Sequence, residues 1–263
     1  MAPAQGRGGR PAEGEPVLDR AFRVLDAFSG DESALRLRDL SERAELPMST
    51  AFRLAQRLVR LGALERWPDG SYTIGVRMLT YAALAPRGHG LRAIALPYME
   101  DLHRATGQHV QFAVREGSDG VIVERLSAKG AGKLLYHAGA RIPLHGTSAG
   151  IVLLAHARPA FVNAYLQRPM TLEPEGIVLD PAEVRERLAR IRAQGYGEMK
   201  RLLPEPAESV AAPVFDRTGV CIAALSVVGA DGSVEMRMAQ SAVVAIAGVI
   251  TRDVGRSPNL PDR

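Results

Sequence analysis

Residues 37–74 read LRDLSERAELPMSTAFRLAQRLVRLGALERWPDGSYTI, and the rest of the chain is organised around them. An apolar repeat over residues 37–44 predicts a short helix, and a second, longer helix follows a tight break. Gly62 ends that second helix, because glycine adopts a left-handed turn without steric cost. Two short apolar-rich runs then flank Asp69-Gly70, a strong hairpin signal. Helix, turn, helix and hairpin is the order of a winged helix-turn-helix.

The second helix of this motif predicts a DNA-contacting surface. Its apolar positions recur at helical spacing and form one face: Ala51, Leu54, Ala55 and Leu58. The N-terminal end of such a helix enters the major groove, where Arg bonds guanine and Ser or Thr reaches bases or phosphate. We therefore expect Ser49, Thr50 and Arg53 to contact bases, and Arg57 and Arg60 to contact phosphates. Tyr72 of the wing is a further expected DNA contact. The alternative is an amphipathic helix whose basic face is merely solvated.

The same residues resemble a known family. LPMSTAFRLAQRLVRLGALER is similar to LPKSTVHRLLxTLxxxGxLER of IclR-type bacterial transcription regulators, and GSYTIGVRML is similar to that family's wing and linker, xxYxLGxxLL. The resemblance covers about residues 17–254. It implies a ligand-responsive repressor that binds double-stranded operator DNA, with an activator of the same fold as the alternative.

The basic charge of the chain is concentrated in one place. The formal net charge of the 263-residue chain is only +4. Its first 85 residues hold 12 Arg and no Lys against 11 acids, so the positive charge that matters lies on the second helix. The single cysteine, Cys221, excludes an intrachain disulfide and suits a reducing compartment. With no apolar run long enough to span a membrane, and no cofactor fingerprint or metal spacing, we expect a cytoplasmic protein without cofactor.

The pattern along the chain predicts an α+β fold. We expect a disordered arm at 1–16, a winged helix-turn-helix domain at 17–74, a linker helix and hinge at 75–90, an effector domain at 91–254 and a tail at 255–263. In the first helix, the expected inward face is Leu18, Ala21, Phe22, Leu25 and Phe28. The effector domain alternates helices with strands expected at 108–116, 121–127, 134–137, 209–216 and 220–228, which predicts a largely antiparallel sheet flanked by helices.

A loop in the second half indicates a small-molecule site. Residues 142–150 read IPLHGTSAG, with two glycines just before an apolar helix, where free N–H groups attract carboxylates. The alternative is a tight loop whose glycines only permit close packing. PLHGTSAG resembles the family's PLHATAAG loop, which borders the effector pocket, and SVAAPVFDRTGVCIAALSVVG resembles CIAAPVFDxxGxVVAALSVSG, two central strands of its GAF-like domain.

Carried over by position, this resemblance implies an effector pocket built from Gly146, Thr147, Ala149, Ser209, Ser226 and Val228. Relatives commonly have Cys in place of Ser209 and a polar residue in place of Val228. We therefore expect an organic acid, such as an aromatic acid, in a pocket more apolar than one built for a small keto acid.

An enzyme is the rival class of function. Ser148 lies in Gly146-Thr-Ser-Ala-Gly150, which has the spacing of G-x-S-x-G, and His145 stands beside it. The strand that should precede such a nucleophile is poor, and spacing alone does not establish chemistry, so we expect no catalysis.

Assembly is the last expectation. One recognition helix covers too few base pairs to find a site in a genome, and symmetric dimers solve this with two half-sites. The expected linker helix has an apolar face at Val76, Leu79 and Ala83, with Tyr72, Met78 and Tyr81 as further exposed apolar area. We therefore expect a homodimer closed through this region; the resemblance also implies a dimer of dimers.

Overall fold

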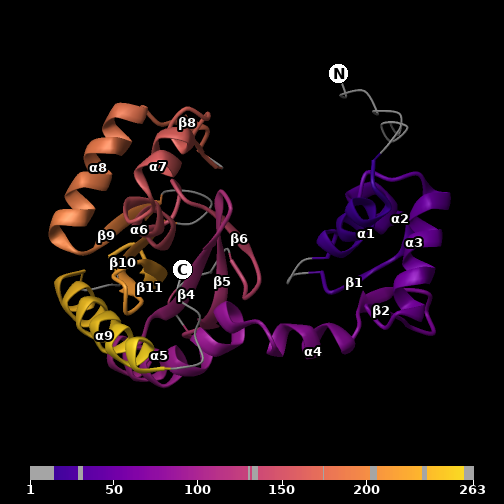
Figure 1. Ribbon diagram of the computed structural model, residues 1–263, viewed down its shortest axis with the longest axis horizontal. Coiled ribbons are helices and arrows are strands. Elements are labelled where there is room, and N and C mark those ends of the chain that lie inside the picture. The colour runs from indigo at the N-terminus through magenta and orange to yellow at the C-terminus, as the bar shows by residue number, and fades with distance from the viewer. Residues whose placement is uncertain are drawn as a thin grey trace. The chain divides into compact units, whose positions relative to one another are not determined.

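The computed structural model describes residues 15–28, 32–129, 131, 136–173, 175–201, 206–232 and 236–257. The chain forms two compact units, Met1–Leu84 and Ala85–Arg263 (Figure 1). Most of the predicted arm, the end of the predicted tail and residues 134–135 of a predicted strand lie outside the described residues. No helix in the described part is long and apolar enough to cross a membrane.

The first unit is a winged helix-turn-helix. Its elements are α1 (Val17–Asp26), β1 (Ala34–Leu35), α2 (Leu37–Arg43), α3 (Met48–Arg60), β2 (Leu64–Arg66), β3 (Tyr72–Ile74) and α4 (Arg77–Ala83). The strands form an antiparallel sheet in the order β1-β3-β2. Helices α1, α2 and α3 and the sheet enclose one apolar core, in which Val24, Leu40 and Ala51 are completely buried. The predicted order of elements is confirmed.

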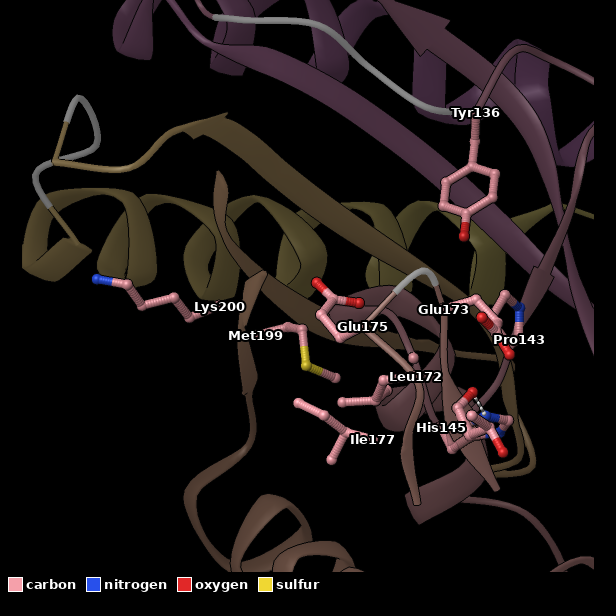
Figure 2. Close-up of a pocket in the computed structure, with 11 residues that line it drawn as sticks. Tyr136, Pro143, His145, Leu172, Glu173, Glu175, Ile177, Met199 and Lys200 are labelled. Carbon is pink, nitrogen blue, oxygen red and sulfur yellow. Dashed lines mark hydrogen bonds between the residues drawn. The ribbon is translucent and has the colours of Figure 1, made fainter. Parts of the chain in front are cut away.

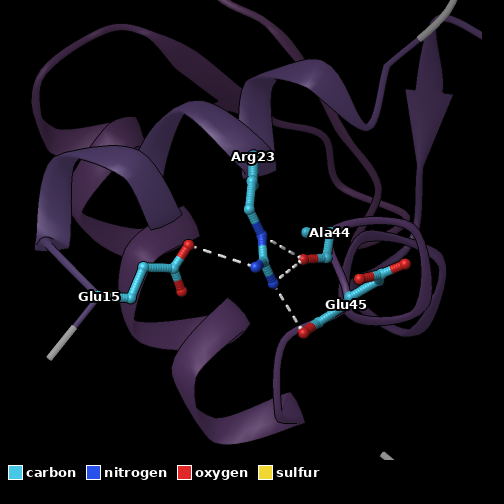
Figure 3. A network of polar contacts seen from close by, with 4 residues as sticks. All are labelled: Glu15, Arg23, Ala44 and Glu45. Carbon is cyan, nitrogen blue, oxygen red and sulfur yellow. Dashed lines mark hydrogen bonds and ion pairs between the residues drawn. The ribbon is translucent and has the colours of Figure 1, made fainter. Parts of the chain in front are cut away.

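The turn between α2 and α3 is held by an arginine of α1 (Figure 3). Arg23 Nε donates to the Ala44 carbonyl at 2.8 Å, and its Nη2 donates to the Glu45 carbonyl at 2.7 Å. Glu45 has φ 51°, a left-handed conformation that costs a non-glycine residue free energy. Arg23 also pairs with Glu15 at 3.3 Å. These charged bonds offset the strain and fix the angle at which α3 leaves α2.

The expected inward face of α1 needs correction. Leu18 and Phe22 of α1 are 68% and 62% exposed, whereas Val24 takes the central core position. Ala21, Leu25 and Phe28 of the expected face do pack against the core, so the expectation was wrong only for Leu18 and Phe22, and it omitted Val24. The Arg36 N–H donates to the Asp39 carboxylate at 3.1 Å, and this bond caps the start of α2.

Two glycines allow the chain to pass from α3 through the wing to α4. Gly62 has φ +74°, as expected for the residue that ends α3. Gly75 packs so closely that a Cβ on it would lie 2.3 Å from the Gly62 carbonyl oxygen. Its N–H donates to Ala63 at 2.9 Å. The wing can therefore close against the end of α3 only with glycine at position 75.

The second unit contains an antiparallel six-stranded sheet in the order β6-β5-β4-β11-β10-β9. A π-helical turn, η1 (Pro86–Gly90), and α5 (Leu91–Thr106) precede it. The strands are β4 (His109–Glu116), β5 (Asp119–Leu126), β6 (Arg141–Pro143), β9 (Gly197–Arg201), β10 (Ala207–Phe215) and β11 (Cys221–Ala230). A small separate hairpin is formed by β7 (Thr171–Leu172) and β8 (Ile177–Val178). The predicted α+β class is confirmed, although β6, β9 and this hairpin were not predicted.

Helices cover both faces of the large sheet (Figure 1). On one face, α5 and α9 (Met236–Arg256) enclose a core with Phe112 and Leu225 at its centre. On the other face lie α6 (Ser148–Ala155), α7 (Pro159–Tyr165) and α8 (Pro181–Gln194), with Ala211 and Ala224 beneath α6. All of α6 is buried. Small alanines on the strands let this helix approach the sheet closely.

Candidate DNA interface and effector cavity

Helix α3 buries one face and exposes the other, as the sequence predicts. Its buried positions are the four expected apolar residues, Ala51, Leu54, Ala55 and Leu58. Its first turn forms directly after Pro47, whose carbonyl accepts the Thr50 and Ala51 N–H groups at 2.8 and 2.9 Å. Ser49 and Arg53 are exposed near this end, and Thr50 is half-buried. The N-terminal end of α3 is therefore open to a groove.

Three arginines of α3 carry unneutralised charge. Arg53, Arg57 and Arg60 are exposed, and none forms an ion pair with a residue that the structure describes. By contrast, Arg38 of α2 already pairs with Glu42 at 2.9 Å. No acidic residue lies in the first turn of α3. A long basic face without internal partners suits contact with phosphates and base edges.

The wing requires one correction. Tyr72 is only 1% exposed and packs in the core, so its ring can neither contact DNA nor add to an exposed apolar face. The Arg66 guanidinium lies over this ring, 5.7 Å from its centroid. Trp67 is instead the exposed aromatic residue of the wing, at 56%, and its Nε1 donates to Thr73 Oγ1 at 3.1 Å. Side chains alternate between the two faces of a strand, and a strand as short as β3 does not show from its sequence which face is buried. The prediction that Tyr72 contacts DNA was therefore wrong.

The effector domain contains a cavity of about 220 Å³ beside the start of α6 (Figure 2). Its wall combines the loop before α6, the β7–β8 hairpin and the edge strand β9. The lining residues are Tyr136, Pro143, His145, Gly146, Thr171, Leu172, Glu173, Glu175, Ile177, Met199 and Lys200. Figure 2 shows the Met199 side chain extending toward Leu172 and Ile177. The cavity thus has an apolar side on these three residues and a polar rim.

The six predicted effector residues lie on or near this side of the sheet, but only Gly146 lines the cavity. Thr147 caps α6, because its Oγ1 accepts the Gly150 N–H at 3.0 Å, and Ala149 is 3% exposed within the first turn of α6. In the sheet, Ser209 is paired in register with Val228 and Met199, and Ser226 with Ala211. Ser209 donates to the Met199 carbonyl at 3.2 Å, which places it behind a cavity-lining residue.

Sequence reasoning missed the hairpin wall. Thr171-Leu172 and Ile177-Val178 are two-residue strands around a turn with Gly176 at φ +69°. Short runs with Leu172 on one side of a turn and Ile177-Val178 on the other were the available signal, but strands this short have no detectable period. Lys200 of β9 lines the same cavity, yet its amine pairs with Glu208 at 3.2 Å and Asp231 at 2.7 Å. Figure 2 shows that amine pointing away from the other lining residues.

His145 joins the loop to the hairpin and to α7. Its Nε2 lies 3.0 Å from the Thr171 carbonyl, and its Nδ1 lies 2.7 Å from the Tyr165 hydroxyl. Because a carbonyl only accepts, Nε2 carries the proton and Nδ1 accepts from Tyr165. Burial raises the pKa of Tyr165, which keeps its hydroxyl protonated as the donor. This arrangement ties the cavity's hairpin wall to the loop before α6 and to α7.

The same geometry argues against the hydrolase reading. Ser148 is 3% exposed within α6, so its hydroxyl is not presented to a substrate. Both ring nitrogens of His145 are engaged by other groups. The described residues hold no group of His, Cys, Asp and Glu side chains suited to a metal ion. Burial raises the pKa of Cys221 to about 12, so this thiol is unreactive as well.

Comparison with known proteins gives matches along nearly the whole chain. A family model described as the IclR helix-turn-helix domain matches residues 17–68, and one described as bacterial transcriptional regulator IclR C-terminal matches residues 84–253. The transcriptional regulator XynR of Escherichia coli is 29% identical over 212 residues, covering 80% of this chain and 84% of XynR. The transcriptional repressor AllR of Escherichia coli is 26% identical over 259 residues, covering 95% of this chain and 94% of AllR.

Among solved structures, an IclR homologue from Microbacterium hydrocarbonoxydans, crystallised with 4-hydroxybenzoate, is similar throughout. The two chains are 34% identical with a TM-score of 0.81, and the match covers 92% of this chain and 100% of the other. Relatives of this kind are named as transcriptional regulators and not as enzymes.

Proposed function

This chain belongs to the IclR family of bacterial transcriptional regulators, and on that premise we propose that it is a homodimeric repressor released from its operator by a small organic acid. It binds DNA through its helix-turn-helix domain and regulates transcription. The observation that carries the proposal is the exposed basic face of α3, which has no carboxylate partner among the described residues.

The proposed DNA contacts follow from position along α3. Ser49, Thr50 and Arg53 lie at the N-terminal end and are assigned to base edges in the major groove. Arg57 and Arg60 lie one and two turns further on and are assigned to phosphate. On the wing, the exposed Trp67 and Arg66 replace the buried Tyr72 as candidates for contact with the backbone. Base contacts set sequence preference, whereas phosphate contacts set affinity and its salt dependence.

The proposed effector site is the cavity at the start of α6. A ring would lie against Leu172, Ile177 and Met199, and a carboxylate would lie beside Gly146, close to the N-terminal end of α6. A volume of about 220 Å³ is small for a ligand pocket, which favours a single-ring metabolite. The complex of the Microbacterium homologue with 4-hydroxybenzoate supports an aromatic acid as the class.

Dimerisation is proposed from apolar side chains that a single DNA-binding domain leaves uncovered. Leu18 and Phe22 of α1 are 68% and 62% exposed, and Val76 and Leu79 near α4 are 74% and 68% exposed. Large apolar side chains exposed to this degree are typical of a surface that another chain covers. Pairing two copies would cover these residues and fix the spacing of two α3 helices on a near-palindromic operator.

Repression is proposed because AllR, which matches 95% of this chain, is named a repressor. A promoter fusion to a reporter gene tests the sign. Deletion of the regulator should raise expression from a promoter that it binds, whereas a fall on deletion would make it an activator.

The effector site is tested by thermal unfolding with 4-hydroxybenzoate and related acids. A ligand at 100 times its dissociation constant should add about 2.7 kcal/mol to the free energy of unfolding. Leu172→Trp should abolish that gain by filling the cavity. Val178→Trp is the matched control, because Val178 lies on the same hairpin, is 73% exposed and does not line the cavity. Equal stabilisation of both variants would move the site elsewhere.

A further inference from the structure

A second hollow lies at the other end of α6. It has a volume of about 390 Å³ and lies, open to solvent, where α6 ends, α7 begins and α8 passes beside them. Its lining residues are Ala155, His156, Ala157, Pro159, Val162, Asn163, Arg185, Leu188 and Arg192. None of these residues lines the effector cavity described above. The two hollows are therefore separate, and α6 runs from one to the other.

Two guanidinium groups of α8 dominate the chemistry of this second hollow. Arg185 and Arg192 are seven residues apart, so they share one face of the helix, about 10 Å apart along its axis. No aspartate or glutamate is among the lining residues. Glu183 and Glu186, the acids of α8, fall at other angles around the helix by their spacing. The hollow consequently has an unneutralised positive potential.

Each guanidinium is tethered by a neutral acceptor. Arg185 Nη1 donates to Asn163 Oδ1 at 2.9 Å, and Arg192 Nη1 donates to the Ala155 carbonyl at 2.9 Å. Neither arginine forms an ion pair with a carboxylate in the described parts of the chain. A guanidinium has five N–H donors, so one such bond orients the group and leaves most of its donors for a ligand.

His156 is the third polar side chain of this hollow whose surroundings bear on its charge. Its ring lies edge-on to Phe215 at 5.2 Å, and its Nε2 is buried without a hydrogen-bond partner among the described residues. Burial, and then the charge of Arg192, lower the pKa of His156, so the ring is neutral at physiological pH. The ring of His156 therefore adds no charge to that of the two arginines, and no acidic residue that the structure describes lines the hollow.

We propose that this hollow is a second small-molecule site, which binds an organic polyanion such as a tricarboxylate or a phosphate ester. Carboxylate and phosphate oxygens match the fork of an arginine, and two forks on one helix face select a ligand with two or more anionic charges. The volume suits a metabolite rather than a single inorganic ion. This inference is independent of the DNA and effector assignments, since it uses none of their residues.

Calorimetric titration of the full-length protein with citrate, and separately with inorganic phosphate, tests the proposal. Arg185→Gln should weaken citrate binding by about tenfold or more, because a charged bidentate contact is lost. Asn163→Asp should do the same while keeping both arginines, since the new carboxylate would neutralise Arg185. Arg190→Gln is the control, with the same charge change on the same helix outside the hollow, and should bind citrate as the parent does.

Acetate, at matched ionic strength, should bind far more weakly than citrate because it can satisfy only one arginine. The proposal is overturned if the parent gives no binding with citrate or phosphate at millimolar concentration, or if acetate binds equally well. It is also overturned if Arg190→Gln loses as much affinity as Arg185→Gln, because the effect would then be one of net charge.

Discussion

His145 offers the sharpest test of how the effector cavity is built. Replacing it with alanine removes the donor to the Thr171 carbonyl and the acceptor for the Tyr165 hydroxyl. Tyr165 is only 6% exposed, so its hydroxyl proton would lose its acceptor where water cannot easily replace it. Leaving one buried polar group unpaired costs about 1–3 kcal/mol of folding free energy. We expect His145→Ala to lower the free energy of unfolding by that amount.

A double-mutant cycle separates this bond from the loss of the ring. Tyr165→Phe removes only the hydroxyl and keeps the ring that packs near Phe161. If the bond is as described, His145→Ala should cost less in the Tyr165→Phe background than in the parent. Residues in direct contact commonly show coupling of about 0.5–3 kcal/mol. Urea unfolding of the four proteins, followed by circular dichroism, measures it.

Ligand affinity should depend on the bond between His145 and the β7–β8 hairpin. His145→Gln keeps an N–H near the position of Nε2 and should preserve the bond to Thr171, whereas His145→Ala releases the hairpin wall. We therefore expect ligand affinity to fall in His145→Ala and to be largely retained in His145→Gln, with DNA affinity unchanged in both. Strictly additive stabilities, or equal ligand affinity in the alanine variant and the parent, would refute the role assigned to this histidine.

Three further outcomes are expected. Arg53→Ala should weaken operator binding by about 1–3 kcal/mol and relax one base position, whereas Arg57→Ala should weaken all sequences evenly and lower the salt slope by about 1, as fluorescence anisotropy would measure. Gly75→Ala should destabilise the DNA-binding domain by about 1–3 kcal/mol or more in thermal unfolding, because its Cβ would lie 2.3 Å from the Gly62 carbonyl oxygen. Although burial opposes it, hydrogen bonds from Thr218 and the following turn hold the pKa of Asp216 below its ordinary value, so Asp216→Asn should be less stable than the parent at neutral pH, and the difference should shrink as pH falls below about 4 and through the lowered pKa.

The DNA-binding domain was predictable because its signals are local. The four buried residues of α3 repeat at helical spacing, and Gly62 and Asp69-Gly70 mark its end and the hairpin. What could not be predicted is which way a short or weakly periodic element turns. Tyr72 sits in a three-residue strand and Phe22 in a helix with apolar residues on two sides, so tertiary packing decided which side was buried.

The lining of the effector cavity was harder to predict from the sequence, for a different reason. The loop at Gly146 was identifiable from its glycines and from the resemblance to relatives. The opposite wall comes from residues 171–177 and from Met199, which are distant in sequence and belong to a two-stranded hairpin and an edge strand. Only the folded sheet brings Met199 beside Ser209, and it places Ser226 too deep, at 1% exposure, to line the cavity.

Sequence-specific DNA binding through α3 is the central claim, and selection from random DNA followed by anisotropy tests it most directly. Purified protein should enrich a near-palindromic site and bind it about a thousandfold or more tighter than scrambled DNA at physiological salt. Arg53→Ala should lose most of that ratio, whereas Arg104→Ala, an exposed arginine of the effector domain, should keep it. Equal affinity of the parent for selected and scrambled DNA, or an Arg53→Ala variant that discriminates as well as the parent, would contradict the account.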